Sequence, residues 1–206
     1  MSEMRSTAFD YTGLHAFVFI DHVPEDTTPR KVVNGLRKLG SPPAGPVISA
    51  LETFGAYVAF AHLWREDPND LGGLLDLISG DLRDEGVRCS YSVEAKTSVV
   101  ATVPKGPKRA SPEIIGLVSI KCRAGTVDTV LQALQNVPGF RGAASISGKF
   151  DILLQLGPDP DVSDDDDDFC GNNGEFRQVI AFAGSSQLQG IDGVLTTSTA
   201  FADGTR

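Results

Sequence analysis

Asp151 is the side chain of this sequence best placed to bind a small molecule. It follows Gly148, Lys149 and Phe150 and begins an apolar stretch, DILLQL. A carboxylate at this place could bind the ammonium group of a ligand, or it could accept hydrogen bonds from backbone N–H groups of the turn. Glycine lets the backbone approach a ligand closely. We therefore expect a ligand site at residues 148–151, with turn stabilisation as the alternative.

Hydroxyl groups near the carboxyl end form a second candidate site. The run from Thr196 to Thr199 carries only hydroxyl side chains. Those of Thr197 and Thr199 could bind the carboxylate or amide of a ligand. Thr also favours strands, so a purely structural role of this run is the alternative.

The three histidines, His15, His22 and His62, do not form a recognisable catalytic or metal-binding pattern. Nothing at metal-ligand spacing accompanies them, and no Ser/His/Asp arrangement can be assigned. A haem would need one of them as its axial ligand. We expect no catalytic residues, no metal and no cofactor, and we expect Trp64 to lie in the core.

An acidic run from Asp159 to Asp168 interrupts the second half of the chain. It invites comparison with a calcium loop, but it lacks the glycine and the terminal glutamate of an EF-hand at the required positions, although Glu175 lies nearby. Blocks of like charge are usually solvated. We expect residues 158–175 to form an acidic loop without a metal.

Hydrophobic periodicity predicts the elements that position these residues. An apolar run at 114–120 predicts a strand. Thr126 is the expected N-cap of a following helix, which Pro138-Gly139 ends. Two strands should then flank Ser147-Gly148, and a helix at 176–183 and a strand at 193–201 complete the order βαββαβ of a ferredoxin-like unit. Five apolar residues share the face of the first helix: Val127, Val130, Leu131, Leu134 and Val137.

The segment VPGFRGAASISGKFDILLQL, residues 137–156, resembles the ligand-binding (RAM) domain of the Lrp/AsnC regulators. The matching positions are Pro138-Gly139, Phe140, Gly148, Phe150 and Asp151, and the later GIDGVLTTSTAF resembles the closing segment of that domain. The resemblance implies a small-molecule effector, possibly an amino acid, bound near residues 148–151. No helix-turn-helix pattern precedes the first predicted strand, so we do not expect this chain to carry the DNA-binding domain that precedes the RAM domain in that family.

The first half of the chain repeats the same order of elements. FGAYVAFAHL, residues 54–63, aligns without a gap to SGKFDILLQL, residues 147–156, and Val58 stands where the second copy has Asp151. We interpret the chain as an internal duplication. Its expected parts are a polar tail (1–12), a first unit (13–103), a linker (104–112) and a second unit (113–206).

Both faces of the predicted strands are apolar, which predicts how the two units pack. In the first strand Phe17 and Phe19 alternate with Ala16 and Val18. Helices can cover only one face of each four-stranded sheet, so the other face must be buried elsewhere. The expected fold is therefore α+β, with two ferredoxin-like units packed sheet to sheet. The resemblance implies the same dimeric α+β barrel.

Composition limits the partners. The formal net charge of −9 and the single basic cluster, PKGPKR at 104–109, argue against direct nucleic-acid binding. Three isolated cysteines and the absence of a signal-like or membrane-spanning run are typical of a cytoplasmic protein without membrane contact.

Three classes of function remain open. The resemblance favours a regulatory or assembly module that binds a small-molecule effector and forms a homo-oligomer or joins a partner regulator. The alternatives are a dimeric α+β barrel enzyme, such as a cofactor-free monooxygenase, and a protein–protein interaction module that uses a sheet edge.

Overall fold

The computed structural model describes residues 13–78, 80, 87–94, 114–157 and 186–203 of the 206. The expected tail, linker, acidic loop and helix at 176–183 lie outside the described residues. The first half contains β1 (Leu14–His22), α1 (Pro29–Lys38), β2 (Val47–Gly55), β3 (Ala59–Arg65), α2 (Leu71–Ile78) and β4 (Arg88–Glu94). The second half contains β5 (Ile114–Cys122), α3 (Val127–Leu134), β6 (Phe140–Ser145), β7 (Ile152–Leu156), α5 (Ser186–Gly190) and β8 (Val194–Asp203).

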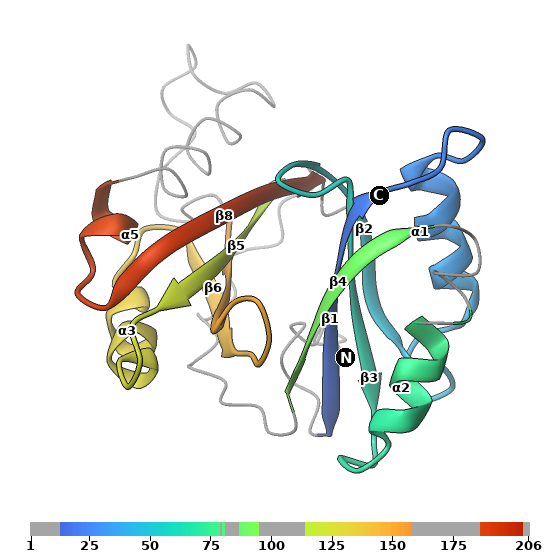
Figure 1. The fold of residues 1–206 in the computed structure, drawn as a ribbon, viewed down its shortest axis with the longest axis horizontal. Coiled ribbons are helices and arrows are strands. Elements are labelled where there is room, and N and C mark those ends of the chain that lie inside the picture. Colours follow the sequence, from blue (N-terminus) through green and yellow to red (C-terminus); the bar gives the residue numbers. More distant parts are fainter. Residues whose placement is uncertain (1–12, 79, 81–86, 95–113, 158–185, 204–206) are drawn as a thin grey trace, which may run out of the picture.

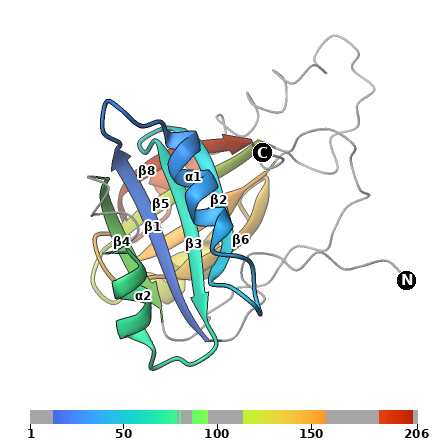
Figure 2. The same ribbon diagram turned by 90° about the vertical axis from the view of Figure 1, so that its right-hand side faces the viewer.

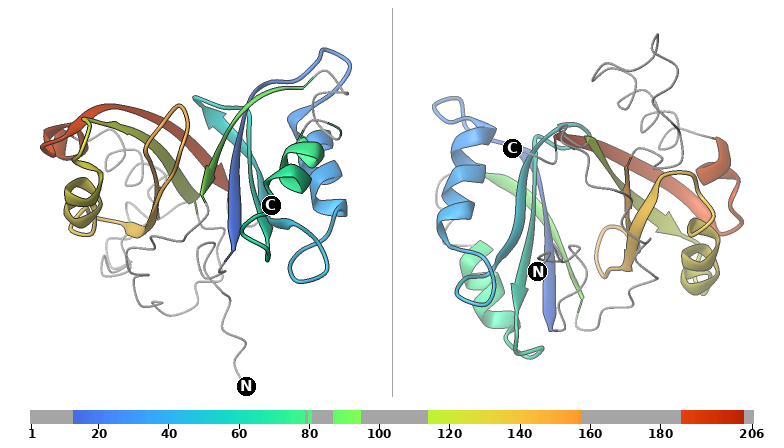
Figure 3. Two further views of the ribbon diagram at one scale, coloured as in Figure 1. Left: turned by 60° about the horizontal axis from the view of Figure 1, so that its bottom comes forward. Right: turned by 180° about the vertical axis from the view of Figure 1, so that it is seen from behind.

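The strands form one antiparallel sheet in the order β4-β1-β3-β2-β8-β5-β7-β6. Each half contributes four adjacent strands, and the halves join where Thr53–Gly55 of β2 pairs with Ala200–Ala202 of β8. Helices cover the two outer sides (Figure 1), with α1 and α2 over the first half (Figure 2). The two halves of the sheet face each other at an angle and diverge away from the β2–β8 seam (Figure 3). The expected α+β fold of two ferredoxin-like units is confirmed.

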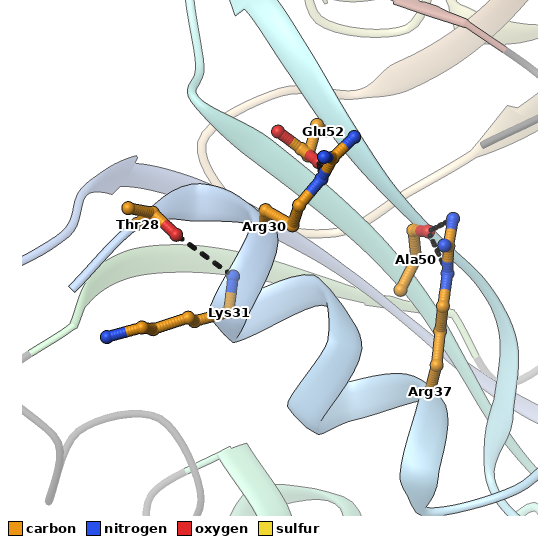
Figure 4. Close-up of polar contacts among 6 residues, drawn as sticks. All are labelled: Thr28, Arg30, Lys31, Arg37, Ala50 and Glu52. Carbon is orange, nitrogen blue, oxygen red and sulfur yellow. Dashed lines mark hydrogen bonds and ion pairs between the residues drawn. The ribbon is translucent and has the colours of Figure 1, made fainter.

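Polar contacts fasten α1 to β2 (Figure 4). Thr28 is the N-cap, and its Oγ1 accepts a hydrogen bond from the Lys31 N–H at 3.3 Å, as Thr-Pro at a helix start predicts. The Arg37 guanidinium donates two hydrogen bonds, of 3.0 and 2.7 Å, to the carbonyl oxygen of Ala50. Arg30 Nε, near the start of α1, also donates to Glu52 Oε1 of β2 at 2.9 Å, so side chains from both ends of α1 contact β2.

The starts of α3 and α2 use different contacts. Thr126 occupies the expected N-cap position of α3, but its hydroxyl donates to the Arg123 carbonyl at 2.8 Å and makes no capping bond. At α2, Asp70 accepts from the Gly73 N–H at 3.0 Å and so caps this helix. Leu71, the first residue of α2, is exposed, whereas Leu74 is buried.

Buried side chains form three clusters. Two lie under the helices, one in each half. The third lies on the opposite face of the sheet, combines both halves, and is called here the inner cluster. Phe150 belongs to it with Leu153, whereas Ile152 lies in the helix-side cluster of the second half, because the turn before β7 breaks the alternation of the strand. The inner cluster consists of Phe17, Phe19, Tyr57, Phe60, Leu117, Ala144, Ile146, Phe150, Leu153 and Ala200.

The same backbone hydrogen bonds occur in both halves, around the turn between the second and third strands of each half. Thr53 N donates to Val58 O at 3.1 Å, and Ile146 N donates to Asp151 O at 2.8 Å. Val58 N donates to Ile20 O, and Asp151 N donates to Ile120 O, both at 2.9 Å. Val58 therefore corresponds to Asp151 and Ile20 to Ile120, in agreement with the gapless sequence alignment.

Candidate functional site between the sheets

Two buried histidines lie on the face of the first-half strands that bears the inner cluster. His15 lies two residues before Phe17 on β1, so their side chains share one face of the sheet. His62 of β3 is the ladder partner of Phe17 and lies on the same face. Each imidazole is 1% exposed. The His62 ring centroid is 4.5 Å from that of Phe17, so the rings extend the aromatic surface of the inner cluster.

The two imidazoles are hydrogen-bonded to each other. His15 Nδ1 and His62 Nε2 are 2.8 Å apart, and the donor is set by the tautomers of the two rings. The ring planes meet at 39° with centroids 5.0 Å apart, so the contact is directed through the nitrogens and is not a stack. Two imidazoles in this arrangement can share one proton and pass it between them.

Burial disfavours the charged form of His62. Removal from water, and secondarily the neighbouring His15, hold the pKa of His62 well below its usual range. A neutral imidazole has one nitrogen acceptor, which makes His62 able to take up a proton when a compensating negative charge forms beside it.

A shallow pocket lies at the end of β3. It has a volume of about 450 Å³ and is lined by residues 43–45, Trp64, Arg65 and three acidic side chains. Trp64 is the ladder partner of His15, although neither histidine lines the pocket. The prediction that Trp64 is a core residue is wrong: it is half-buried, because it lies where β3 leaves the sheet. The three acids are Glu66, Asp67 and Asp70.

The residues predicted as a ligand site surround a tight turn. Asp151 Oδ1 accepts from Lys121 Nζ at 2.9 Å, and its Oδ2 accepts from the Cys122 N–H at 2.8 Å. Lys149 Nζ lies 5.4 Å from the centre of the Phe150 ring, and Gly148 has a φ of +143°, which favours glycine. The carboxylate is therefore bound to the end of β5, and not to N–H groups of the turn as the alternative expected. An effector bound at this turn stays a prediction.

The hydroxyls of Thr197 and Thr199 do not face the inner cluster. Their ladder partners are Ile120 and Val118, which pack under the helices of the second half. Directly paired residues of an antiparallel ladder share a face. The structure therefore does not bring these threonines onto the face that bears Phe150.

Sequence reasoning missed the histidine pair. The signal was present: the apolar runs 14–20 and 59–65 each carry one histidine, and each histidine is two residues from a phenylalanine, Phe17 or Phe60. Placing both histidines on the inner face required the antiparallel register of β1 and β3. No motif spacing encodes that register, because 47 residues separate the two side chains.

Among the described residues no group of three or more His, Cys, Asp or Glu side chains could hold a metal ion. His15 Nδ1 and His62 Nε2 are bonded to each other, so in this arrangement neither of these two nitrogens is open to a haem iron. Within the same residues, no helix has the length and apolar character needed to cross a membrane.

Comparisons with known proteins identify the fold. No protein-family description matches the sequence, and no curated protein matches it. A solved anthrone oxidase-like protein is similar with a TM-score of 0.56 and 9% identity, over 95% of this chain and 92% of that one. The siroheme decarboxylase NirDL, solved with an iron-uroporphyrin III analogue, is similar with a TM-score of 0.54 and 9% identity, over 91% and 70%. At such identities the similarity extends to the fold alone, and it does not single out the Lrp/AsnC regulators.

Proposed function

We propose that this protein is an enzyme of the dimeric α+β barrel type that removes a proton from a neutral, ring-containing small molecule, with the His15–His62 pair as the base. The observation that carries the proposal is the imidazole pair itself: two polar rings, fully buried, hydrogen-bonded to each other and set among aromatic side chains. Burying such groups costs free energy, and strand pairing does not require them.

The proposed step is the ionisation of a carbon acid. The C–H bond of the substrate breaks, its electron pair stays on the substrate as a conjugated anion, and the proton moves to the imidazole pair. Low polarity disfavours an isolated imidazolium, but the anion formed beside it restores the charge balance. Proton uptake is therefore coupled to substrate ionisation, and water does not protonate the pair prematurely.

The pocket beside Trp64 suits the approach of such a substrate. Its volume of about 450 Å³ lies within the range of small-molecule sites, and its indole offers an aromatic face. Glu66, Asp67 and Asp70 outnumber Arg65 along its wall, so the pocket repels anions and admits neutral molecules. An anionic amino-acid carboxylate is a poor match for this wall.

The fold comparison agrees with this class of chemistry and is the source of the first test compound. The similar anthrone oxidase-like protein suggests anthrone, a neutral three-ring ketone with an acidic methylene group. A cofactor-free oxidation would begin with this ionisation, and dissolved O2 would be the oxidant in the later step. Oxidation is a consequence of the proposal and is not needed to test it.

The test follows exchange of the anthrone methylene protons for deuterium by NMR, under nitrogen. The wild-type protein should accelerate exchange over buffer, and His62→Gln should lower that acceleration by about 10²- to 10⁴-fold, the usual contribution of a positioned base. Glutamine is a conservative choice because Gln155 occupies the corresponding position in the second half.

His22→Gln is the matched control, because His22 is exposed at the end of β1 and lies outside the pair. It should leave the exchange rate unchanged. Equal rates for the wild type and His62→Gln, at full occupancy by anthrone, would show that the pair is not the base.

A further inference from the structure

Two buried hydroxyl groups at the other end of the inner cluster have no hydrogen-bond partner within the described part of the chain. They are Tyr57 Oη and Ser119 Oγ. Tyr57 is 4% exposed and Ser119 is 1% exposed, so solvent does not satisfy them. Buried hydroxyls are almost always hydrogen-bonded in folded proteins, so two orphaned groups on one face need an explanation.

The β2–β8 seam brings these two residues to the same region. Ala56 N, next to Tyr57, donates to the Thr199 carbonyl at 3.0 Å, and the neighbouring Ser198 is the ladder partner of Ser119. Tyr57 packs in the inner cluster, with its ring centroid 5.0 Å from that of Phe19. Ser119 shares this face, because its partner on β7 is Leu153 of the same cluster.

The internal duplication shows that the fold does not need either hydroxyl. The repeated hydrogen bonds make Tyr57 correspond to Phe150 and Ser119 to Phe19. Each hydroxyl-bearing residue therefore has a phenylalanine counterpart on the inner face of the other half. Serine is also smaller than phenylalanine, so the side chain on β5 fills less volume than its counterpart on β1.

We propose that Tyr57 and Ser119 form a binding site for a small planar molecule that carries a phenolic hydroxyl or a ring carbonyl. The ring would pack beside Phe19 and Phe150, which contact each other edge to face with centroids 6.4 Å apart, and its oxygen would take the two orphaned hydroxyls as hydrogen-bond partners. Such a site favours a ligand with an oxygen over its hydrocarbon analogue, because the hydrocarbon leaves both hydroxyls unsatisfied.

This site is separate from the histidine pair. Val58 N bonds to Ile20 O, so the turn that carries Tyr57 lies at the Ile20 end of β1. His15 is five residues away along the same strand, or about 16 Å at the usual rise of a strand. The proposal therefore stands whether or not the histidine pair is catalytic.

The test compares phenol with toluene, which have similar size and shape, by calorimetric titration of the whole protein. Phenol should bind about tenfold more tightly than toluene, the preference that one well-formed hydrogen bond provides. Tyr57→Phe and Ser119→Ala should each remove most of this preference and leave toluene binding unchanged. Tyr91→Phe removes a hydroxyl beside the helix-side cluster and should change neither affinity.

Ser119→Phe, which introduces the residue of the other half, should abolish binding of both compounds by filling the site. Equal affinities of the wild type for phenol and toluene, absence of binding of both, or a preference that survives in Tyr57→Phe and Ser119→Ala would each overturn the proposal. Those outcomes would show that water, or packing alone, accounts for the two hydroxyls.

Discussion

The two halves of this molecule have the same backbone arrangement and different inner faces. In the first half the inner face carries His15 and His62; the corresponding residues of the second half are Ile115 and Gln155. In the second half Asp151 binds the end of β5, where the first half has Val58. The difference teaches that strand pairing and helix packing tolerate wide changes on the inner face. Polar groups that appear on one inner face only are therefore the best candidates for function.

If the two halves share one cooperative core, a cavity in one half should destabilise both halves together. Leu154→Ala should give the largest effect. Leu154 is fully buried in the second half, and its counterpart is Ala61. The cavity should lower the free energy of unfolding by about 2–5 kcal/mol. Because the inner cluster joins both halves, fluorescence of Trp64, the single tryptophan and a first-half residue, should show the same shifted midpoint as circular dichroism.

Leu195→Ala is the control for this experiment, since Leu195 is 61% exposed on β8. It should change stability by no more than about 0.5 kcal/mol. A Trp64 midpoint that stays at the wild-type value in Leu154→Ala would show that the halves unfold independently.

Replacing the pair by its second-half counterparts, His15→Ile with His62→Gln, should change the pH dependence of stability. The pKa of folded His62 lies below the value of about 6.5 for an unfolded histidine. Below pH 6.5 the unfolded chain binds a proton that the folded chain excludes, so wild-type stability is full above 6.5 and falls as pH drops.

The double variant lacks this loss. Urea unfolding should therefore show that the wild type loses more stability between pH 7.5 and 5.5 than the variant, by about 1 kcal/mol, since one pH unit corresponds to about 1.4 kcal/mol for one fully titrating group. Parallel pH profiles would mean that the buried pair is already protonated in the folded state.

Much of the fold could be predicted from the sequence because it depends on local periodicity. The helical spacing of Val130, Leu131 and Leu134 and the doubly apolar strands each reflect packing on one or two faces. The first half then showed the same order of elements as the second, which indicated the duplication. Helix caps were less predictable: Thr126 has the right type and position, but its hydroxyl bonds backward to Arg123.

The candidate site could not be predicted, because it depends on register and not on local pattern. His15 and His62 meet only when β1 and β3 pair with Phe17 opposite His62; a shift of one residue would separate them onto opposite faces. Asp151 was found from its sequence context, yet its two partners, Lys121 and Cys122, lie 29 or 30 residues away. Such partners follow from tertiary structure alone.

Asp151→Val, which introduces the first-half residue, should lower stability by about 1–2 kcal/mol. The Cys122 N–H would lose its acceptor, and Lys121 would lose a partner that is only partly exposed. Asp192→Ala is the control: Asp192 pairs with Arg123 but is 90% exposed, and its loss should cost less than about 0.5 kcal/mol. Equal losses for both variants would show that Asp151 contributes no more than a surface ion pair.

The smallest expected difference concerns the threonines that begin the first helix of each half. Thr28 Oγ1 accepts from the Lys31 N–H, whereas Thr126 makes no capping bond to α3. Thr28→Ala should therefore lower stability by about 0.5–1 kcal/mol, because an N–H at the helix start loses its acceptor. Thr126→Ala should cost about half as much, since the lost bond to Arg123 O lies outside the helix and that carbonyl also accepts from Thr126 N. Chemical denaturation of both variants alongside the wild type measures the difference. A larger loss for Thr126→Ala would show that the bond to Arg123, and not helix capping, is the more important role of threonine at these starts.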